Sequence, residues 1–359
     1  MFNINIKYPC LQKSVSFKGF NDCTHNIKSE NAMDYCIHET HFFRNLETLT
    51  FTRDYLLKHF PNGTHIAGFG CSNGEEEYSL AMLLKEENAD KKYKITGYDI
   101  ASNVVNKAQS GPFEIKGAQC ERLIKDNSAY KENKNKFLRQ LFFECFEPVP
   151  ERVFSIRGRD KSEIQSAFGE RIEQEQDPAQ LLKWKCYKEI ATSLYDYKKD
   201  NSYMPKWEVF GDILDFKCGD INKISKILNG KEQTGAIIFK NAWYHILGRN
   251  YVSHSSFLNL AGAENVMKQC SDILPEGGLF VVGNLEQDHL YDGQRGHVIK
   301  QDGKKIRVYD DTLFHRLLRK NGFQPVFYER VKDTQERFYM SGDIYLPSVW
   351  QKIKTDKAV

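Results

Sequence analysis

A glycine-rich turn near residue 70 constrains the fold of this chain more than any other stretch. Residues 66–69 read IAGF, and residues 70–79 read GCSNGEEEYS. A helical stretch follows at 78–84, and a strand pattern at 93–98 runs directly into Asp99. A strand, a tight glycine turn, a helix and a second strand tipped by a carboxylate form the front half of a nucleotide-binding βαβ unit. We therefore expect such a unit over residues 64–99.

The charge at the expected start of the helix limits the kinds of nucleotide ligand that can bind there. Residues 75–77 are all glutamate. Free N–H groups at a helix N-terminus usually favour phosphate, but three carboxylates would repel a pyrophosphate and tolerate a cationic centre. S-adenosylmethionine (SAM), a sulfonium with an α-ammonium and no phosphate, fits better than NAD or ATP. The alternative is that the glutamates only complement the helix dipole, worth a few tenths of a kcal/mol each. Gly68, Gly70 and Gly74 favour the ligand, because they let the backbone pass close beneath it.

Composition limits the class of protein. The 359 residues allow one large domain with insertions or two domains, and 40% hydrophobic residues predict a folded core. A net charge of +3 implies no field for nucleic acid or membrane binding. Nine cysteines without paired spacing predict reduced thiols, and no ligand cluster indicates a metal. Because no signal peptide and no apolar run of about 18 residues is visible, we expect a soluble, cytoplasmic protein without membrane insertion.

Four regions follow from the pattern along the chain. We expect residues 1–37 to be an N-terminal extension or a remnant helical region, 38–112 the first half of the nucleotide-binding domain, 113–205 an inserted, partly helical subdomain for substrate recognition, and 206–359 the second half. Helices are expected at 39–60, 102–110 (Ser102 as N-cap, Gly111 as stop), from Asp177-Pro178 to 194, and at 222–229, 261–274 and 311–320 (ending at Asn321-Gly322). Strands are expected at 213–216, 219–221, 235–239, 278–283, 324–330 and 336–345. Strands that alternate with helices predict an α/β fold with a doubly wound, mostly parallel, Rossmann-like sheet.

With these residues assembled, the chain resembles the CheR family of chemotaxis-receptor glutamate methyltransferases. Residues 38–44 (HETHFFR) resemble the family's T-x-F-F-R motif, and residues 70–79 resemble G-C-S-T-G-E-E-P-Y-S without a gap. Residues 99–111 resemble D-I-D-x-x-V-L-x-K-A-R-x-G. Residues 238–241 resemble I-F-C-R-N with one residue fewer, and residues 274–286 resemble L-x-P-G-G-x-L-F-L-G-x-S-E with one residue more.

The resemblance implies a class I SAM-dependent methyltransferase that acts on a protein glutamate and releases S-adenosylhomocysteine. Arg44, a planar fork suited to a carboxylate, would hold either the donor's carboxylate or the acceptor. Asp99 would accept from the ribose hydroxyls, and either Glu75 or Glu76 would pair with the donor's ammonium. Asp220 would contact the adenine edge, although an N-cap role explains it nearly as well.

The remaining candidates complete this site. Ile221 would lie on the adenine ring, Asn241 would face the ligand, and Cys71 would be a small buried residue beneath the loop rather than a nucleophile. Tyr244 and His245 are candidates for the acceptor pocket, since an aromatic ring near a sulfonium gains cation–π attraction. A lone histidine beside an aromatic residue is, however, more often packed core than a catalytic residue. The donor-binding set is Thr40, Arg44, Gly70, Cys71, Gly74, Glu75, Glu76, Asp99, Ile100, Asp220, Ile221, Asn241 and Ala242, and the catalytic set is Arg44, Tyr244 and His245.

The departures from the family leave the acceptor open. Glu77 stands where the family has proline, Ala101 where it has an acid, and residues 242–245 read AWYH in place of an apolar turn and a tyrosine. The insert at 113–205 occupies the slot of the family's receptor-docking β subdomain. The first hypothesis is methylation of a protein glutamate. Its alternatives are methylation of another protein group or a small molecule, and a SAM-binding regulator without turnover.

Overall fold

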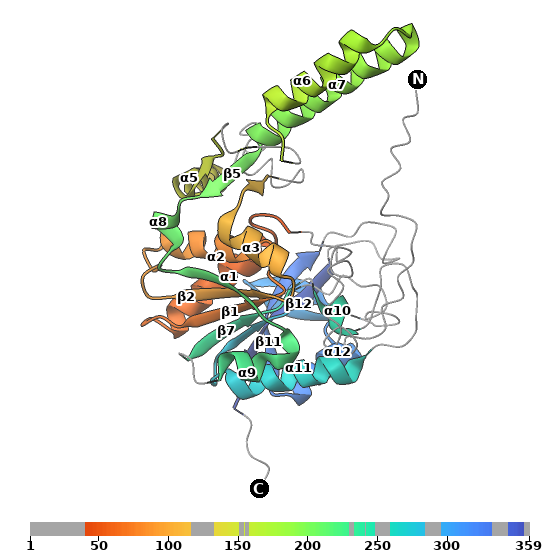
Figure 1. Ribbon diagram of the computed structural model, residues 1–359. Helices are drawn as coiled ribbons and strands as arrows, with labels where there is room; N and C mark the ends of the chain where they lie inside the picture. The colour runs from red at the N-terminus through yellow and green to blue at the C-terminus, as the bar shows by residue number, and fades with distance from the viewer. Residues whose placement is uncertain are drawn as a thin grey trace. The chain divides into compact units, whose positions relative to one another are not determined.

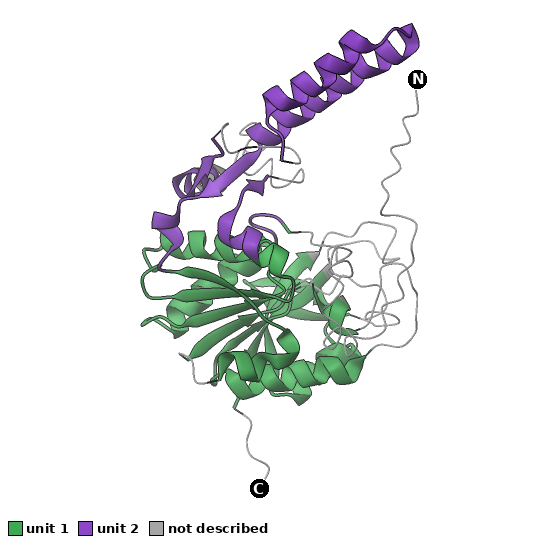
Figure 2. Ribbon diagram, viewed as in Figure 1, with its two compact units in different colours: residues 1–40, 45–105, 213–359 green, residues 41–44, 106–212 purple. Residues whose placement is uncertain are grey.

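The computed structural model describes residues 40–115, 133–150, 154, 158–229, 233–240, 242–247, 259–283, 296–331 and 344–354. The chain divides into two compact units (Figure 2). Unit 1 contains residues 1–40, 45–105 and 213–359, and unit 2 contains residues 41–44 and 106–212.

A mixed sheet forms the centre of unit 1. Its strand order among the described residues is β6-β2-β1-β7-β8-β12-β10-β9, with β11 paired to β12. The strands are β1 (His65–Phe69), β2 (Lys94–Asp99), β6 (Leu214–Cys218), β7 (Thr234–Ile238), β8 (Leu279–Val281), β9 (His297–Gln301), β10 (Lys304–Val308), β11 (Phe323–Val331) and β12 (Ile344–Lys352). The first five strands of this sheet in chain order are thus arranged 3-2-1-4-5, the order of a doubly wound nucleotide-binding fold.

The pairing confirms a mostly parallel sheet. The pairs β1–β2, β1–β7, β2–β6 and β7–β8 are parallel, whereas β12 runs antiparallel to both β8 and β11. Every residue of β1 and β7 is buried, as expected for strands covered on both faces.

Helices cover both faces of this sheet (Figure 1). Helices α1 (Leu46–His59) and α2 (Glu75–Glu86) lie on one face, and α9 (Ile224–Leu228), α11 (Leu260–Ile273) and α12 (Leu313–Lys320) lie on the other. The short elements η4 (Ile221–Lys223) and α10 (Trp243–Leu247) follow β6 and β7. The main core of unit 1 includes Phe69, Tyr98, Ile237, Trp243 and Trp350, all almost completely buried.

Unit 2 combines a small sheet with a long helical hairpin. Its strands β3 (Phe113–Glu114), β5 (Ser202–Pro205) and β4 (Phe146–Pro148) pair antiparallel in the order β3-β5-β4. The helices are α5 (Asn133–Cys145), α6 (Lys161–Gln174), α7 (Pro178–Asp200) and α8 (Trp207–Phe210), and α3 (Ser102–Ser110) leads into the unit. Helices α6 and α7 pack side by side as the hairpin (Figure 1).

Aromatic rings and helix caps explain how unit 2 forms. The Phe42 ring contacts those of Phe113, Phe142 and Phe146 at centroid distances of 5.7, 5.1 and 5.0 Å. Asp160 begins α6 with a capping box. The Asp177 carboxylate accepts from the Ala179 N–H at 3.0 Å, and Pro178 is the first residue of α7. The predicted start of this helix at Asp177-Pro178 is confirmed.

Four predictions of elements were wrong. The expected strand at 219–221 is absent, because Asp220 caps the short helix η4 that begins at Ile221. The helix expected from residue 39 begins only at Leu46, because Phe43 and Asn45 adopt left-handed backbone angles (φ 57° and 54°) that interrupt a helix. The last strand lies at 344–352 rather than 336–345, and the chain between β11 and β12 falls outside the described residues. Ser102 is the first residue of α3 rather than its cap.

The β9–β10 hairpin was missed. Its strands meet at Asp302 and Gly303, whose φ angles are 49° and 75°. An Asp-Gly pair between two strands is the usual signal for such a two-residue turn, so the sequence did contain the information.

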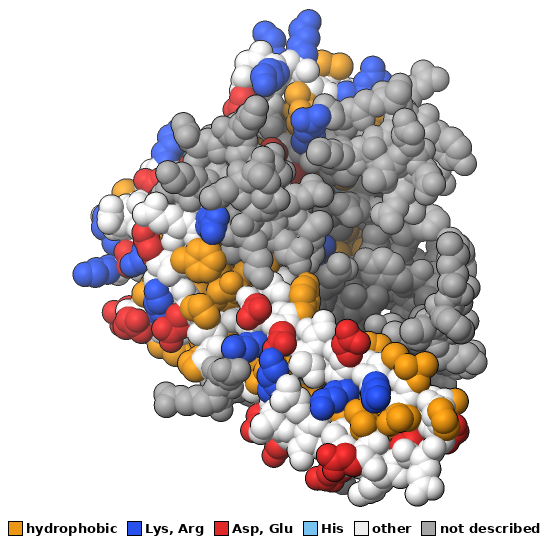
Figure 3. All heavy atoms as spheres, turned by 90° about the horizontal axis from the view of Figure 1, so that it is seen from above, with side chains coloured by type: hydrophobic (Ala, Val, Ile, Leu, Met, Phe, Trp, Pro, Cys, Tyr) orange, Lys and Arg blue, Asp and Glu red, His pale blue; other side chains and the backbone are white. Residues whose placement is uncertain are grey.

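The described helices include none that is both long and apolar enough to cross a bilayer. Acidic and basic side chains are interspersed over the described part of the face shown in Figure 3. The surface seen there is of mixed charge.

Candidate functional site

The carboxyl ends of the parallel strands bring the predicted residues of unit 1 to one edge of the sheet. Strands β1, β2 and β6 lie on one side of the point where the order reverses, and β7 and β8 on the other. In open α/β sheets, ligands bind beyond the carboxyl ends at this switch point. The candidate site is therefore the edge that follows Phe69, Asp99, Cys218 and Ile238.

The glycine-rich loop between β1 and α2 takes a conformation that needs its glycines. Gly70 and Gly74 have φ angles of 66° and 87°, in the left-handed region that side chains disfavour. A Cβ at Gly70 would lie 3.1 Å from the Ala242 Cβ, so the loop passes close to the segment after β7. Ser72 also has a positive φ of 52°. The loop is thus a tight turn across the switch point.

Asp99 ties this loop to the end of β2. Its Oδ2 accepts from the Ser72 N–H at 2.9 Å, and its Oδ1 accepts from the Ala101 N–H at 3.0 Å. The Cys71 N–H donates to the Tyr98 carbonyl at 3.1 Å. Each carboxylate oxygen has a second lone pair, so the geometry fits a carboxylate that also accepts from two ligand hydroxyls.

Asp220 and Ile221 reach the same edge through β6. The Gly219 N–H donates to the Asp99 carbonyl at 2.9 Å, which holds the start of η4 beside the end of β2. The Asp220 carboxylate accepts from the Asn222 N–H at 2.9 Å and acts as the N-cap of η4. Ile221 is buried in the main core together with Ala242. The N-cap role considered for Asp220 is thus present in the structure.

The three glutamates of the first turn of α2 differ in environment. The side chains of Glu75 and Glu77 are buried, whereas Glu76 is partly exposed. A Cβ at Gly68 would lie 2.2 Å from Glu77 Oε1, so this carboxyl group packs directly against β1. Burial, together with the charge of Glu76, raises the pKa of Glu77 to about 8. Glu77 is therefore protonated in the folded chain at neutral pH.

Cys71 lies beneath the loop, as predicted. It is 5% exposed, and a Cβ at Gly97 would lie 3.2 Å from its Sγ. Burial and the nearby acidic groups of Glu77, Asp99 and Glu75 hold the pKa of the Cys71 thiol well above its usual value. Such a thiol is a poor nucleophile, because the thiolate is the reactive form.

The other predicted residues of unit 1 are placed as follows. Ile100 is half-buried after β2. Thr40 is half-buried, and among the described residues its hydroxyl has no hydrogen-bond partner. His245 is half-buried in α10, and its backbone N–H donates to the Ala242 carbonyl at 3.1 Å. Tyr244 lies in the same helix.

Two predicted residues fall outside this arrangement. Arg44 belongs to unit 2, where it is half-buried and its backbone N–H donates to the His41 carbonyl at 3.3 Å. Asn241 lies outside the described residues.

Lys240 was not predicted, and the structure gives it a prominent place. It directly follows the apolar run of β7 and is 4% exposed, and its Nζ lies 3.2 Å from Glu76 Oε1. Its signal in the sequence was its position, the residue just before Asn241 in the stretch that resembles I-F-C-R-N. A lysine next to a strand usually lies at the surface, so composition alone did not select it.

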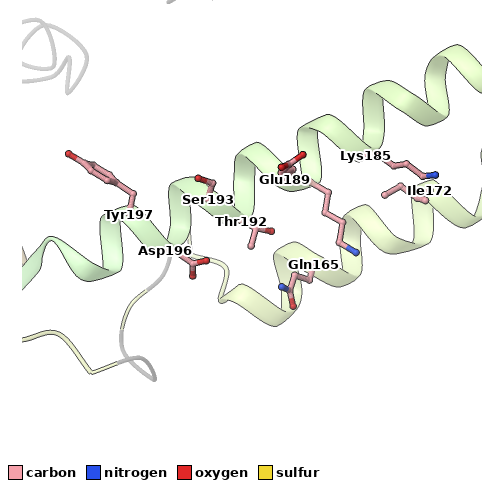
Figure 4. Close-up of a pocket in the computed structure, with 9 residues that line it drawn as sticks. Gln165, Ile172, Lys185, Glu189, Thr192, Ser193, Asp196 and Tyr197 are labelled. Carbon is pink, nitrogen blue, oxygen red and sulfur yellow. The ribbon is translucent and has the colours of Figure 1, made fainter.

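A concave feature lies on the hairpin of unit 2. An open groove of about 850 Å³ runs between α6 and α7 (Figure 4). Gln165 and Ile172 line it from α6, and Lys185, Thr192 and Asp196 are among the residues that line it from α7. Its lining contains none of the predicted site residues. Among the residues that the structure describes, no group of three His, Cys, Asp or Glu side chains is placed to hold a metal ion.

The sheet order and the loop together define a doubly wound fold of the Rossmann-like class I methyltransferase type. Comparison with known proteins gives a more specific result. Residues 38–139 match the family described as CheR methyltransferase, SAM binding domain. Over these residues the chain is similar to CheR methyltransferases, and S-adenosylmethionine is the cofactor that the matched domain binds.

Individual relatives agree with the family match over a limited length. A chemotaxis protein methyltransferase of Campylobacter jejuni is 35% identical over 113 residues, 31% of this chain and 42% of that protein. A chemotaxis protein methyltransferase of Borreliella burgdorferi is 30% identical over 128 residues, 30% of this chain and 45% of that protein. The chain therefore matches less than half the length of each relative.

Among solved structures, a SAM-dependent methyltransferase from Methanosarcina mazei is 12% identical, with 85% of this chain and 98% of that chain covered and a TM-score of 0.34. The assignment of the fold rests on the sheet order of this chain rather than on that similarity.

Proposed function

We propose that this chain is a SAM-dependent methyltransferase whose acceptor is a carboxylate, in the first place a protein glutamate side chain. The observation that carries the proposal is the Asp99 carboxylate, which closes the Gly70–Gly74 loop through the Ser72 N–H inside the segment that matches a SAM-binding domain. The acidic first turn of α2 supports a cationic ligand over a phosphate. CheR-like relatives named as chemotaxis methyltransferases support a protein acceptor.

Different residues of unit 1 would bind different parts of the donor. Asp99 would accept from the ribose hydroxyls, and Ile221 would lie on the adenine ring, with Asp220 at its edge. Glu75 or Glu76 would pair with the α-ammonium. Gly70 and Gly74 would leave space for the donor's chain, with Ala242 opposite. Thr40, Cys71, Ile100 and Asn241 complete the proposed donor-binding set.

Catalysis by this set requires alignment rather than acid–base chemistry. SAM supplies a methyl group on a sulfonium, and its transfer to a carboxylate oxygen leaves a methyl ester and the neutral thioether S-adenosylhomocysteine, with no proton to move. An acceptor glutamate is already ionised at neutral pH. Arg44 would hold a carboxylate in place while it loses water, and Tyr244 and His245 would line the acceptor pocket.

We also propose that unit 2 recognises the acceptor and that the protein works in the cytoplasm. Unit 2 contains the α6–α7 hairpin and its groove, in the slot where the resembled family carries its receptor-docking β subdomain. The cysteines at 71, 145, 186, 218 and 270 are free thiols, as suits a reducing compartment.

The test is incubation of the purified chain with methyl-labelled SAM and cell lysate, followed by mass spectrometry of the labelled species. We expect S-adenosylhomocysteine to form and the label to be released by mild alkali, because methyl esters hydrolyse. An Asp99→Ala variant serves as the inactive control. Binding of SAM without any turnover on carboxylate-bearing acceptors would contradict the proposal.

A second candidate function is methylation of a protein nitrogen or a small molecule, favoured by the α6–α7 hairpin as a recognition element of a new kind. A label that is stable to alkali would support this candidate against the first. SAM binding with no turnover on any component of the lysate would instead support a regulator without activity.

A further inference from the structure

Lys240 is an ammonium group enclosed by protein at the edge where the donor is proposed to bind. Its side chain is 0% exposed, whereas that of its partner Glu76 is 14% exposed. Gly283, at the end of β8, provides the space, because a Cβ there would lie 3.1 Å from the Lys240 Cγ. A buried charge of this kind is costly unless it is paired. Its contact with Glu76, 3.2 Å between Nζ and Oε1, supplies that pairing.

Two further acidic side chains, Glu77 on α2 and Glu329 on β11, are influenced by the charge of the same ammonium. The charge of Lys240 lowers the pKa of Glu77 and that of Glu329, although burial raises both above their usual value. Glu329, on β11, is 5% exposed. The charge of Lys240 thus acts on acidic side chains of α2 and β11, and its contact at ion-pair distance is with Glu76.

The surroundings of Glu329 are fixed by the start of α1. The Glu329 carboxylate accepts from the Asn45 side-chain amide and, at 3.0 Å, from the Thr48 hydroxyl. The Thr48 hydroxyl also lies 3.1 Å from the Ser348 hydroxyl on β12. Hydrogen bonds from the start of α1 thus hold the Glu329 side chain in place.

We propose that Lys240 is a positioning residue: it holds the Glu76 carboxylate at the N-terminus of α2 in one orientation for the α-ammonium of the methyl donor. This inference rests on the proposed function, and it selects Glu76 rather than Glu75 as the carboxylate that pairs with the donor. Glu76 is the more exposed of the two, so a ligand reaches it more easily.

The experiment compares two ligands by calorimetry. SAM carries the α-ammonium, whereas 5′-methylthioadenosine keeps the adenosine and the sulfur but lacks the amino-acid part. We expect Lys240→Met and Glu76→Gln each to weaken SAM binding about 10- to 100-fold, the range for hydrogen bonds to charged groups. Neither variant should change the affinity for 5′-methylthioadenosine, and Lys240→Arg should recover most of the affinity for SAM.

The double variant Lys240→Met/Glu76→Gln measures the coupling. If Lys240 acts through Glu76, the double variant should bind SAM no more weakly than Glu76→Gln alone. Lys268→Met serves as a matched control, because Lys268 forms an exposed ion pair with Asp272 on α11. If Lys240→Met does not fold, Lys240→Arg and Glu76→Gln still give the comparison of the two ligands.

The outcomes separate this inference from the function on which it rests. Equal losses of affinity for SAM and 5′-methylthioadenosine, or wild-type affinity for SAM in both Lys240→Met and Glu76→Gln, would overturn the positioning role. Failure of the wild-type chain to bind either ligand would instead overturn the proposed function.

Discussion

Asp99 combines a structural and a proposed ligand-binding role in one carboxyl group. Asp99→Ala leaves the Ser72 and Ala101 N–H groups without their acceptor, which should cost about 1–3 kcal/mol of the free energy of unfolding. Affinity for SAM, measured by calorimetry, should fall as well. In the control Asp272→Ala, an exposed ion pair is lost, and both quantities should stay close to wild type. Unchanged SAM affinity in a folded Asp99→Ala variant would contradict the ligand-binding role.

The raised pKa of Glu77 makes the stability of the folded chain depend on pH. The folded chain keeps the proton of Glu77 up to about pH 8, whereas the unfolded chain releases it near 4.5. The unfolded state therefore binds fewer protons between these values, and this group makes stability decrease as the pH rises through the window, by up to about 1.4 kcal/mol per pH unit.

Urea unfolding of wild type and Glu77→Gln between pH 5 and 8 measures this contribution. Glu77→Gln should remove it, so the difference in stability between the two proteins should change with pH. Glu173→Gln, on the exposed side of α6, should leave the wild-type dependence as it is. A constant difference between wild type and Glu77→Gln would show that Glu77 is ionised in the folded chain.

At the scale of elements, the first turn of α12 depends on a neutral histidine. His315 Nδ1 accepts from the Thr312 N–H at 3.3 Å, and the Thr312 hydroxyl accepts from the His315 N–H at 3.2 Å. Burial, and to a lesser extent Arg319, lowers the pKa of His315 to about 3. The folded state thus binds fewer protons than the unfolded state between pH 3 and 6.5. Stability from this group is complete above pH 6.5 and is lost as the pH falls towards 3.

His315→Gln should keep the capping box of α12 and remove the imidazole that titrates. Glutamine at this position can still complete a capping box, so α12 should form, and the loss of stability on acidification should become smaller. The variant loses the ring contact with Trp350 and should be about 1 kcal/mol less stable at pH 7. The measurement is urea unfolding at pH 4, 5, 6 and 7. An acid sensitivity equal to that of wild type would contradict the assignment.

Helix α7 presents an apolar face away from its partner helix. Leu182, Ile190 and Leu194 are 65%, 54% and 45% exposed, whereas Tyr195 is fully buried and its hydroxyl donates to the Phe154 carbonyl at 3.2 Å. Ile190→Ser should therefore change the free energy of unfolding by no more than about 0.5 kcal/mol. The matched change Tyr195→Ala should cost about 3 kcal/mol or more. Denaturant unfolding tests both, and a large loss in Ile190→Ser would show that this face is covered in solution.

At the scale of the whole molecule, the proposed donor site of unit 1 and the groove of the hairpin can be distinguished by where a ligand gives protection. SAM at 100 times its Kd should stabilise the folded chain by about 2.7 kcal/mol. Hydrogen exchange should slow at residues 70–75 and 99–101. The amides of α6 and α7, which border the groove of the hairpin, should exchange at the same rate as without SAM. They serve as the internal reference. Protection confined to the groove of Figure 4 would place the ligand there instead.

Elements of the fold were predicted correctly where the signal lies in neighbouring residues. The strand, glycine turn, helix and carboxylate-tipped strand at 64–99 follow from neighbouring residues, and so does the start of α7 at Asp177-Pro178. The early start assigned to α1 failed, because the apolar periodicity continues through Phe43 and Asn45, where the backbone turns left-handed. Apolar periodicity alone does not reveal such a break.

The amino-acid sequence by itself determined the doubly wound plan and the set of groups at its edge, because strand periodicity, glycine turns and helix caps are interactions between near neighbours. Only the tertiary structure decided which of these groups meet. Glu76, Lys240 and Glu329 lie far apart along the chain. The fold brings the buried Lys240 ammonium to 3.2 Å from Glu76 and close enough to Glu329 for its charge to act on that carboxyl group. Burial also raises the pKa of Glu77, so that it keeps its proton, whereas Glu76 next to it has a cation beside it. Burial and partner geometry, which no short stretch of sequence specifies, decide these differences.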